Sequence, residues 1–473
     1  MNFVVIISDT LRRDHLGCYG NEWISTPHID GFAAESLLFE NAYCGSFPTV
    51  PHRRDVLTGR FTASYTPWAP LSADEVVLPD VLRERGYVSM MVCDCPHILE
   101  NGYHYDRGFD GFEWIRGQET DRWRTAPEAP PDPCDPAKLR NPEGMRRRHR
   151  RNVAWRRYES DTFVARTMTE ACRWLERNRR RERFLLYVDT FDPHEPWDAP
   201  QWYVDMYDPG YEGEAVDYPQ YAPTDFLTAE ELRHARALYA AEVTLVDRWV
   251  GRLLEKVGDL GLLDDTMVLF TTDHGFLHGE HGIIGKSLIS PERFAYVPLY
   301  EEVNHIPLIV HFPGADAGVR RAVVQPMDFM PTVVELACAT MPETVHGRSF
   351  AGVLRGEGDE HREFAVSSPY IGGESAPATV TSGRWSAVFW SAPREGEGIV
   401  DRAVDGLAKA QSAAEERHDA LFDLRADPGQ EEDVAAGHPD VMAELRARLV
   451  AFWREVGADA DAVRRWEEPQ EAH

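Results

Sequence analysis

Two aspartates and two histidines closely follow apolar runs that have the composition of buried strands. Asp9 follows the run at 3–7, Asp273 and His274 follow the run at 266–272, and His194 lies shortly after the run at 183–188. Ligands of open α/β sheets bind at the carboxyl ends of the strands, so we expect these side chains to lie together. Two carboxylates and an imidazole form a mixed oxygen and nitrogen set that suits a divalent metal ion.

A threonine begins a short predicted helix in the stretch NAYCGSFPTVPHRRDVLTGR (41–60). Pro51 suits the first turn and Gly59 can end the helix, so Thr49 lies where free N–H groups and the helix dipole favour an anion. The threonine can serve simply as the helix cap. With a metal ion to lower its pKa, its hydroxyl is instead an activated nucleophile. Arg53, one turn away, can offer a fork of N–H groups to a bound oxyanion.

The glycine-rich stretch DHGFLHGEHGIIGK (273–286) ends in a second candidate cation. Lys286 provides a point charge for a further oxygen of the same oxyanion. His278 and His281 can be metal ligands, acid–base groups or ordinary loop residues, and their spacing does not decide among these roles. His97 in CDCPH (93–97) is equally open.

Strands and helices alternate along the sequence, which predicts an α/β layered sheet. The predicted strands are buried on both faces, as in a parallel sheet, and comprise residues 3–7, 87–92, 183–188, 266–272 and 307–312. One helical pattern covers 168–175, and a longer one begins with a capping box at Thr228. A change of character after residue 361 predicts a catalytic domain at 1–361 and a smaller C-terminal α+β subdomain at 362–473.

Composition restricts the kind of partner. The 473 residues carry a net charge of −29, which argues against a nucleic acid or an anionic membrane surface. No cleavable leader or long apolar segment is evident, and the seven cysteines are scattered, so we expect reduced thiols in the cytoplasm. The arginine-rich segment 146–157 is either a solvated helix face, or a lid or a contact in a possible homo-oligomer.

Several motifs together make the chain resemble the sulfatase family of the alkaline-phosphatase superfamily. They occur in that family's order along nearly the whole sequence: SDTLRRDHLGCYG (8–20), the stretch 41–60, FDPHEPW (191–197), TTDHG (271–275), GEHGIIGK (279–286) and LFDLRADPGQEEDV (421–434). The resemblance implies the family's fold, which is a central, mostly parallel sheet between helices with a small C-terminal sheet-and-helix subdomain.

The sequence departs from the family pattern at the nucleophile. The family motif has a Cys or Ser that becomes formylglycine where this chain has Thr49, and a Ser where this chain has His52. Threonine cannot become that aldehyde, so no formylglycine is expected. Family members often have two consecutive aspartates after the first strand, whereas this chain has Asp9-Thr10. The phosphonate monoester hydrolase and phosphodiesterase branch is similar in lacking the second aspartate.

The resemblance also implies roles for single residues. It implies one divalent ion, Mn, Zn or Ca, with the ligands Asp9, Asp273, His274 and the substrate-facing Thr49. His194 matches the family histidine near the leaving group, which makes it a candidate general acid. Arg53 matches the arginine of the nucleophile motif, and Lys286 matches a lysine that binds the oxyanion. His97 and His281 are further candidates for substrate binding.

The leading hypothesis is a metal-dependent hydrolase of a small anionic ester, a phosphodiester or a phosphonate monoester, with Thr49 as nucleophile. Threonine is the nucleophile in other branches of the superfamily that the chain resembles. Phosphoryl transfer asks mainly for positioning and charge stabilisation, whereas a sulfated threonine lacks the elimination route of formylglycine. The alternatives are a sulfatase that works without formylglycine, a group transferase, and an inactive binding protein.

Overall fold

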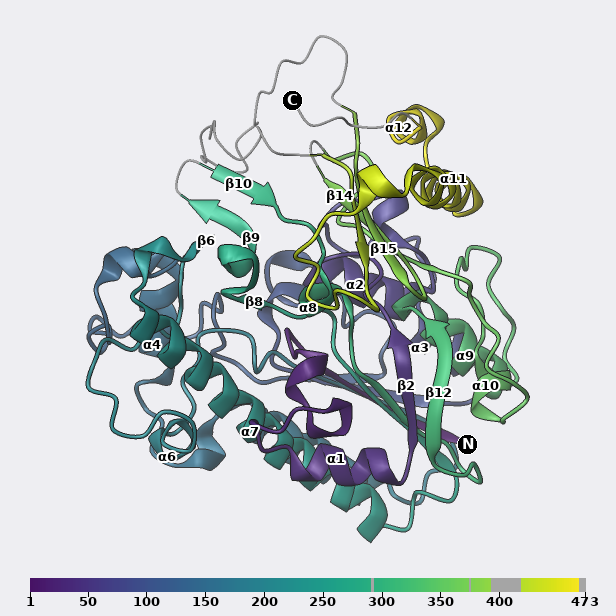
Figure 1. Ribbon diagram of the computed structural model, residues 1–473. Helices are drawn as coiled ribbons and strands as arrows, with labels where there is room; N and C mark the ends of the chain where they lie inside the picture. The colour runs from purple at the N-terminus through teal and green to yellow at the C-terminus, as the bar shows by residue number, and fades with distance from the viewer. Residues whose placement is uncertain (291–292, 374–375, 393–417, 468–473) are drawn as a thin grey trace.

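An eight-stranded sheet forms the centre of the molecule, with strand order β12-β2-β11-β7-β1-β5-β3-β4 (Figure 1). The computed structural model describes residues 1–290, 293–373, 376–392 and 418–467. The strands of this sheet are β1 (Asn2–Ser8), β2 (Leu37–Ala42), β3 (Val88–Cys93), β4 (Gly111–Trp114), β5 (Phe184–Thr190), β7 (Thr266–Thr271), β11 (Leu308–His311) and β12 (Gly318–Val324). All neighbours are parallel except at β11, which runs antiparallel to β2 and β7. The expected mostly parallel sheet is confirmed.

Strand β1 shows why the central strands read as continuous apolar runs. Its side chains alternate between the two faces of the sheet: Phe3, Val5 and Ile7 join one buried cluster, and Val4 and Ile6 join the other. A strand covered on both faces keeps no polar side, so its sequence shows no alternation of polar and apolar residues.

Helices cover both faces of the sheet (Figure 1). One face is covered by α1 (Pro27–Ala34), α5 (Phe163–Asn178) and α7 (Ala229–Asp259), with the short α6 (Gln201–Val204) packed against α7. The other face is covered by α2 (Thr49–Thr58), α3 (Leu78–Arg83), α9 (Phe329–Leu336) and α10 (Ala351–Leu354). The predicted capping box of α7 is present, because Thr228 and Glu231 exchange hydrogen bonds of 2.9 and 3.2 Å.

A second, small sheet stands beside the carboxyl ends of the central strands. It contains β6 (Tyr221–Pro223), β8 (Leu277–His278), β9 (Ile283–Ser290) and β10 (Arg293–Tyr296). The last four residues of the glycine-rich stretch 273–286 belong to strand β9. Lys286 is therefore held by a strand that pairs with β6, β8 and β10. Two further helices are α4 (Arg147–Val153) and α8 (Glu301–Asn304).

The C-terminal part forms an antiparallel sheet with two helices, as expected. The strands are β13 (Ala365–Ser367), β14 (Pro377–Ser382), β15 (Trp385–Trp390) and β16 (Ala420–Asp423), and the helices are α11 (Pro439–Glu455) and α12 (Ala460–Arg464). Their apolar cluster also includes Phe61, Ala63 and Met327 from the predicted first domain. The boundary after residue 361 stays a prediction, and residues 393–417 and 468–473 of the predicted subdomain lie outside the described residues.

None of the helices in the described ranges is long and apolar enough to cross a membrane. All seven cysteines are described, and each is a free thiol. The cytoplasmic location stays a prediction.

Candidate active site

Three neighbouring strands of the central sheet, β7, β1 and β5, deliver an aspartate to the same edge. Asp273 follows β7, Asp9 follows β1, and Asp189 is the next-to-last residue of β5. The register puts the strand ends level, because Ile7 pairs with both Asp189 and Thr271. Parallel strands in register therefore bring three carboxylates together, and all three are fully buried.

Asp9, Asp273 and His274 form the group that the sequence predicts as a metal site. Their candidate ligand atoms lie within 4.8 Å of one another. The Nδ1 atom of His274 donates to the carbonyl oxygen of Gly275 at 2.9 Å, which leaves the lone pair on Nε2. A histidine ligand held in this way is typical of metal sites. Nε2 lies 3.4 Å from a carboxylate oxygen of Asp273, and Asp9 Oδ2 accepts no hydrogen bond from the described residues, although Arg53 Nη1 lies 3.0 Å away, so the donor atoms suit a divalent cation.

Arg53 is enclosed by the same carboxylates. Its Nε and Nη2 donate to the two oxygens of Asp189 at 3.0 and 2.8 Å, and Nη1 contacts Asp9 at 3.0 Å and also Asp273. The guanidinium of Arg53 thus contacts three aspartates, and its expected contact with a bound oxyanion stays a prediction. One positive charge against three carboxylates leaves an excess of negative charge, which a divalent ion would neutralise.

The electrostatics of the group suit a divalent cation. Burial and the nearby Asp273 raise the pKa of Asp9 well above its usual value, despite Arg53 and Lys286. Burial lowers the pKa of His274 to about 3, so its ring is neutral. A neutral imidazole and carboxylates that repel one another are the state in which a metal ion binds most favourably.

Thr49 lies in the first turn of α2, at the edge of a cavity. Pro48 is the residue before the helix, so Thr49 is the first helical residue and not the cap. The helix ends at Gly59, whose φ of 65° is the left-handed conformation that glycine adopts without strain. His52, on the buried side of the helix, is fully enclosed and both its ring nitrogens lack hydrogen bonds within the described residues. Burial lowers the pKa of His52 to about 3.

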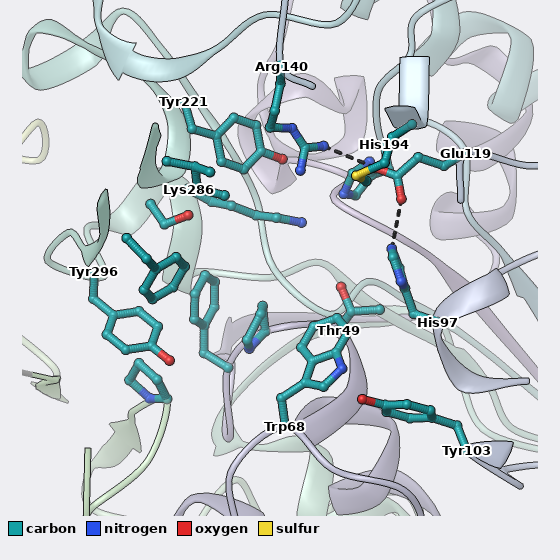
Figure 2. Close-up of a pocket in the computed structure, with 17 residues that line it drawn as sticks. Thr49, Trp68, His97, Tyr103, Glu119, Arg140, His194, Tyr221, Lys286 and Tyr296 are labelled. Atoms are coloured by element: carbon teal, nitrogen blue, oxygen red, sulfur yellow. Dashed lines mark hydrogen bonds and ion pairs between the residues drawn. The ribbon is translucent and has the colours of Figure 1, made fainter. Parts of the chain in front are cut away.

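The cavity has a volume of about 580 Å³ (Figure 2). Its polar lining includes Thr49, His97, Glu119, Arg140, His194, Lys286 and Ser287. Its apolar and aromatic lining includes Phe47, Trp68, Tyr103, Met145, Phe294 and Tyr296. A cavity of this size with a few polar groups among aromatic side chains is typical of a small-molecule site.

Lys286 reaches the cavity from β9 and connects it with the metal group. Its ammonium donates to Thr10 Oγ1 at 3.2 Å and lies 3.3 Å from His274 Nε2. Within the described part of the chain it forms no ion pair with a carboxylate. Lys286 is therefore placed to attract an anionic group next to the metal ligands.

His194 and His97 both contact the ring of Phe191. The ring of His194 stacks on Phe191 with centroids 4.1 Å apart, and the centroid of His97 is 5.5 Å from the same ring. Nδ1 of His194 contacts the carbonyl oxygen of Glu195 at 2.7 Å, which leaves Nε2 with the lone pair. Burial and the charge of Lys286 lower the pKa of His194 well below its usual value.

A network of buried charged side chains lies next to His97 in the cavity. Glu119 contacts His97 Nε2 at 2.9 Å and Arg140 Nη2 at 3.0 Å, and Arg140 also contacts Glu195 at 2.5 Å. Burial opposes the ionisation of Glu119, but His97 and Arg140 hold its pKa well below its usual value. Arg140 is flanked by the rings of Tyr218 and Tyr221 at 4.5 and 4.3 Å.

Some predicted site residues lie elsewhere, and some site residues were missed. His281 is outside the cavity lining, and its ring stacks on Tyr300 with centroids 3.6 Å apart, so its expected role in substrate binding stays a prediction. Asp189 directly follows the predicted strand 183–188 and could have been found by extending that strand by one residue. Glu119 and Arg140 come from a loop without a sequence pattern, so only the fold reveals them.

The arginine-rich segment 146–157 braces the loop that carries Glu119. Arg146 forms a buried ion pair with Asp217, Arg148 donates to the carbonyl oxygen of Thr120 at 2.8 Å, and Arg156 contacts Asp198 at 2.7 Å. These side chains support one wall of the cavity, a role that the sequence did not suggest. The homo-oligomer stays a prediction.

Comparison with known proteins places this site in a family context. The family model described as Sulfatase matches residues 1–339. Arylsulfatase of Clostridium perfringens is 24% identical over 451 residues, covering 85% of this chain and 88% of the relative. Human arylsulfatase A is 27% identical over 480 residues, covering 94% and 86%. Among solved structures, the phosphonate monoester hydrolase of Agrobacterium radiobacter superposes with a TM-score of 0.71 at 19% identity, covering 96% of each chain.

Proposed function

This chain belongs to the sulfatase family, and from that premise we propose that it hydrolyses phosphodiesters or phosphonate monoesters with Thr49 as nucleophile. One observation carries the proposal: Thr49, which the resemblance puts at the family's nucleophile position, lines the same cavity as Lys286. A threonine ester of phosphorus can be hydrolysed by direct attack at phosphorus. A threonine that carries a sulfate ester has no second hydroxyl group, so it cannot expel the sulfate by the elimination that formylglycine uses.

The charges of the cavity favour an ester with one negative charge. Arg140 is neutralised by Glu119 and Glu195, so Lys286 is the cation that remains for the substrate. Phosphodiesters and phosphonate monoesters carry one charge at neutral pH, whereas a phosphate monoester carries nearly two. A second charge would have little to compensate it in a buried site.

A divalent ion held by Asp9, Asp273 and His274 would act as a Lewis acid on substrate oxygens and on the nucleophile. The chain's own groups supply the rest. Lys286 holds a non-bridging oxygen of the ester, and the N-terminal turn of α2 offers N–H groups to the same anion. Arg53 keeps the three aspartates at fixed positions.

His194 is proposed as the group that protonates the departing oxygen. Its Nδ1 is fixed on the Glu195 carbonyl oxygen, so Nε2 is the atom that can face a leaving group. Binding of an anionic ester nearby favours the protonated ring, against the effect of burial. The loss of His194 should then matter most for esters with poor leaving groups.

The second candidate is a sulfate ester hydrolase that works without formylglycine. The names of several relatives favour it, including the arylsulfatases of Clostridium perfringens and human. A sulfate monoester also carries one charge, so the charges of the cavity do not separate the two functions.

The test compares p-nitrophenyl esters of sulfate, phosphate, phenylphosphonate and a phosphodiester. The protein is stripped with a chelator and reloaded with Mn, Zn or Ca before each assay. We expect the phosphodiester or phenylphosphonate to be preferred, and Thr49→Val, which keeps the shape without the hydroxyl, to lose roughly 10³-fold or more in kcat.

Thr49→Ser is the matched control, because it keeps a hydroxyl at the same place and should retain measurable turnover. Activity in Thr49→Val would instead indicate direct attack by water. Preference for the sulfate ester would establish the second candidate, and in that case Thr49→Cys, produced in cells that make formylglycine, should raise the rate.

A further inference from the structure

We propose that His97, positioned by Glu119, is the base that activates water to release the product from Thr49. The inference rests on the proposed function, because it concerns the second half of that reaction. It assigns a role to Glu119, a residue outside every motif of the sequence, and a specific role to His97.

The position of His97 suits contact with a group bound to Thr49. Both side chains line the same cavity (Figure 2), and the turn 96–98 that carries His97 packs against α2. Trp68 and Phe191 border the ring, with centroids 5.4 and 5.5 Å away. The side chain of His97 is 19% exposed, so water can reach a ring that is otherwise fixed in orientation.

Glu119 is held more firmly than its place in a loop would require. Its carboxylate accepts from Tyr218 at 2.7 Å and Arg140 at 3.0 Å, and its backbone N–H contacts His149 Nδ1 at 3.2 Å. Its φ of 32° is in the left-handed range, which is uncommon for a residue other than glycine. Such a conformation persists where surrounding contacts over-determine it, which is frequent at functional sites.

The contact between Glu119 and His97 sets the tautomer and charge of the imidazole. The carboxylate of Glu119 lies 2.9 Å from Nε2 in an ion-pair contact and favours a proton on that atom, so the lone pair lies on Nδ1. When Nδ1 takes a proton, the same carboxylate stabilises the imidazolium. This arrangement of carboxylate, imidazole and water is the usual one for a general base.

The two histidines divide the proton transfers between them. In the first half, Thr49 Oγ bonds to phosphorus and loses its proton to water, the bond from phosphorus to the leaving oxygen breaks, and that oxygen takes the proton of the His194 imidazolium. In the second half, water bonds to phosphorus as His97 Nδ1 removes its proton. The bond to Thr49 Oγ then breaks, and Oγ recovers a proton from the imidazolium.

The test follows both halves with p-nitrophenyl phenylphosphonate and the metal-loaded protein. In Glu119→Gln we expect a burst of about one nitrophenol per active site, followed by a steady rate roughly 10² to 10³ lower than that of the unsubstituted protein. After an acid quench, the peptide containing Thr49 should carry the mass of a phenylphosphonyl group. His97→Asn should give the same result without disturbing the contacts of Glu119 to Arg140 and Tyr218, so it decides the matter if Glu119→Gln fails to fold.

Glu195→Gln is the matched control, because it removes the same charge from Arg140 without touching His97. It should not accumulate the adduct. Accumulation in all three variants would overturn the inference in favour of a general effect of the Arg140 network. So would an equal slowing of both halves without an adduct in His97→Asn. If Thr49→Val remains active and no variant forms an adduct, the proposed function itself fails, and this inference falls with it.

Discussion

At the scale of single residues, Thr10 leaves the positive charge of Lys286 available to a substrate. Its hydroxyl donates to Asp9 Oδ1 at 2.7 Å and accepts from Lys286 Nζ at 3.2 Å. Its φ is 59°, a conformation that aspartate tolerates better than threonine does. Thr10 thus places a neutral hydroxyl between Lys286 Nζ and Asp9 Oδ1.

Replacing Thr10 by Asp should weaken substrate binding. The new carboxylate would pair with Lys286, so KM for a singly charged ester should rise about tenfold, which corresponds to about 1.4 kcal/mol. Thr10→Ser keeps the hydroxyl and should leave KM within a factor of about two. The measurement is steady-state kinetics at saturating metal. An unchanged KM in Thr10→Asp would show that Lys286 does not bind the ester.

The residues that could be predicted are those whose place follows from one strand. Asp9 and Asp273 each follow an apolar run, and parallel strands bring them to one edge. The surroundings of Arg53 could not be read in this way, because they depend on three strands and a helix at once. Glu119 depends on contacts to Arg140 and Tyr218 that lie far away in the sequence.

At the scale of elements, the end of α2 determines how the nucleophile helix packs. Gly59 has a φ of 65°, and a Cβ there would lie 3.1 Å from the side chain of Val345. Gly261 has the same conformation after α7, with φ of 66°, but a Cβ there would meet nothing within 4 Å. A comparison of substitutions at the two glycines can therefore distinguish the cost of backbone strain from the cost of steric crowding.

Gly59→Ala should destabilise the protein more than Gly261→Ala. The left-handed backbone costs both variants roughly 1–2 kcal/mol. Crowding against Val345 should add about 1–3 kcal/mol to the cost of Gly59→Ala alone. Denaturant unfolding of both variants measures the difference. Equal losses would mean that Val345 and Met330 can move aside without cost.

Elements could be predicted where burial shapes the sequence on both faces. Strand β1 was predicted for that reason, since its alternate residues enter two apolar clusters. The direction of β11 could not be predicted, because a buried strand has the same composition whether it is parallel or antiparallel. Three strands of the small sheet were missed because they have only 3, 2 and 4 residues, and β9 was missed because it continues from a glycine-rich stretch.

At the scale of the whole molecule, the C-terminal sheet is anchored to the rest by Asp328. This buried carboxylate accepts from Arg362 Nε at 2.8 Å and from the backbone N–H of Arg348 at 2.8 Å, and contacts His361 Nε2 at 3.2 Å. His361 and Arg362 flank the predicted domain boundary. Burial opposes ionisation of Asp328, but Arg362 holds its pKa well below the usual value.

Arg362→Met should lower the free energy of unfolding by about 3–5 kcal/mol, because it leaves a buried carboxylate without its main partner. The control is Arg355→Met, whose exposed ion pair with Glu335 should be worth less than about 1 kcal/mol. A carboxylate whose pKa is lower in the folded than in the unfolded protein stabilises the fold at pH values above the unfolded pKa. This stabilisation is lost as the pH falls through the folded pKa. The difference between the protein and Arg362→Met should therefore shrink below about pH 4. A difference independent of pH would assign the loss to packing alone.

The cavity draws on two sheets, and this has a consequence for how such a protein changes over generations. The metal group stands on the central sheet, whereas Lys286 and the aromatic side chains Tyr221, Phe294 and Tyr296 stand on the small one. Mutations that reshape the aromatic wall leave the central strands untouched. A descendant can thus acquire a new substrate by drift in one peripheral sheet while it inherits its chemistry intact.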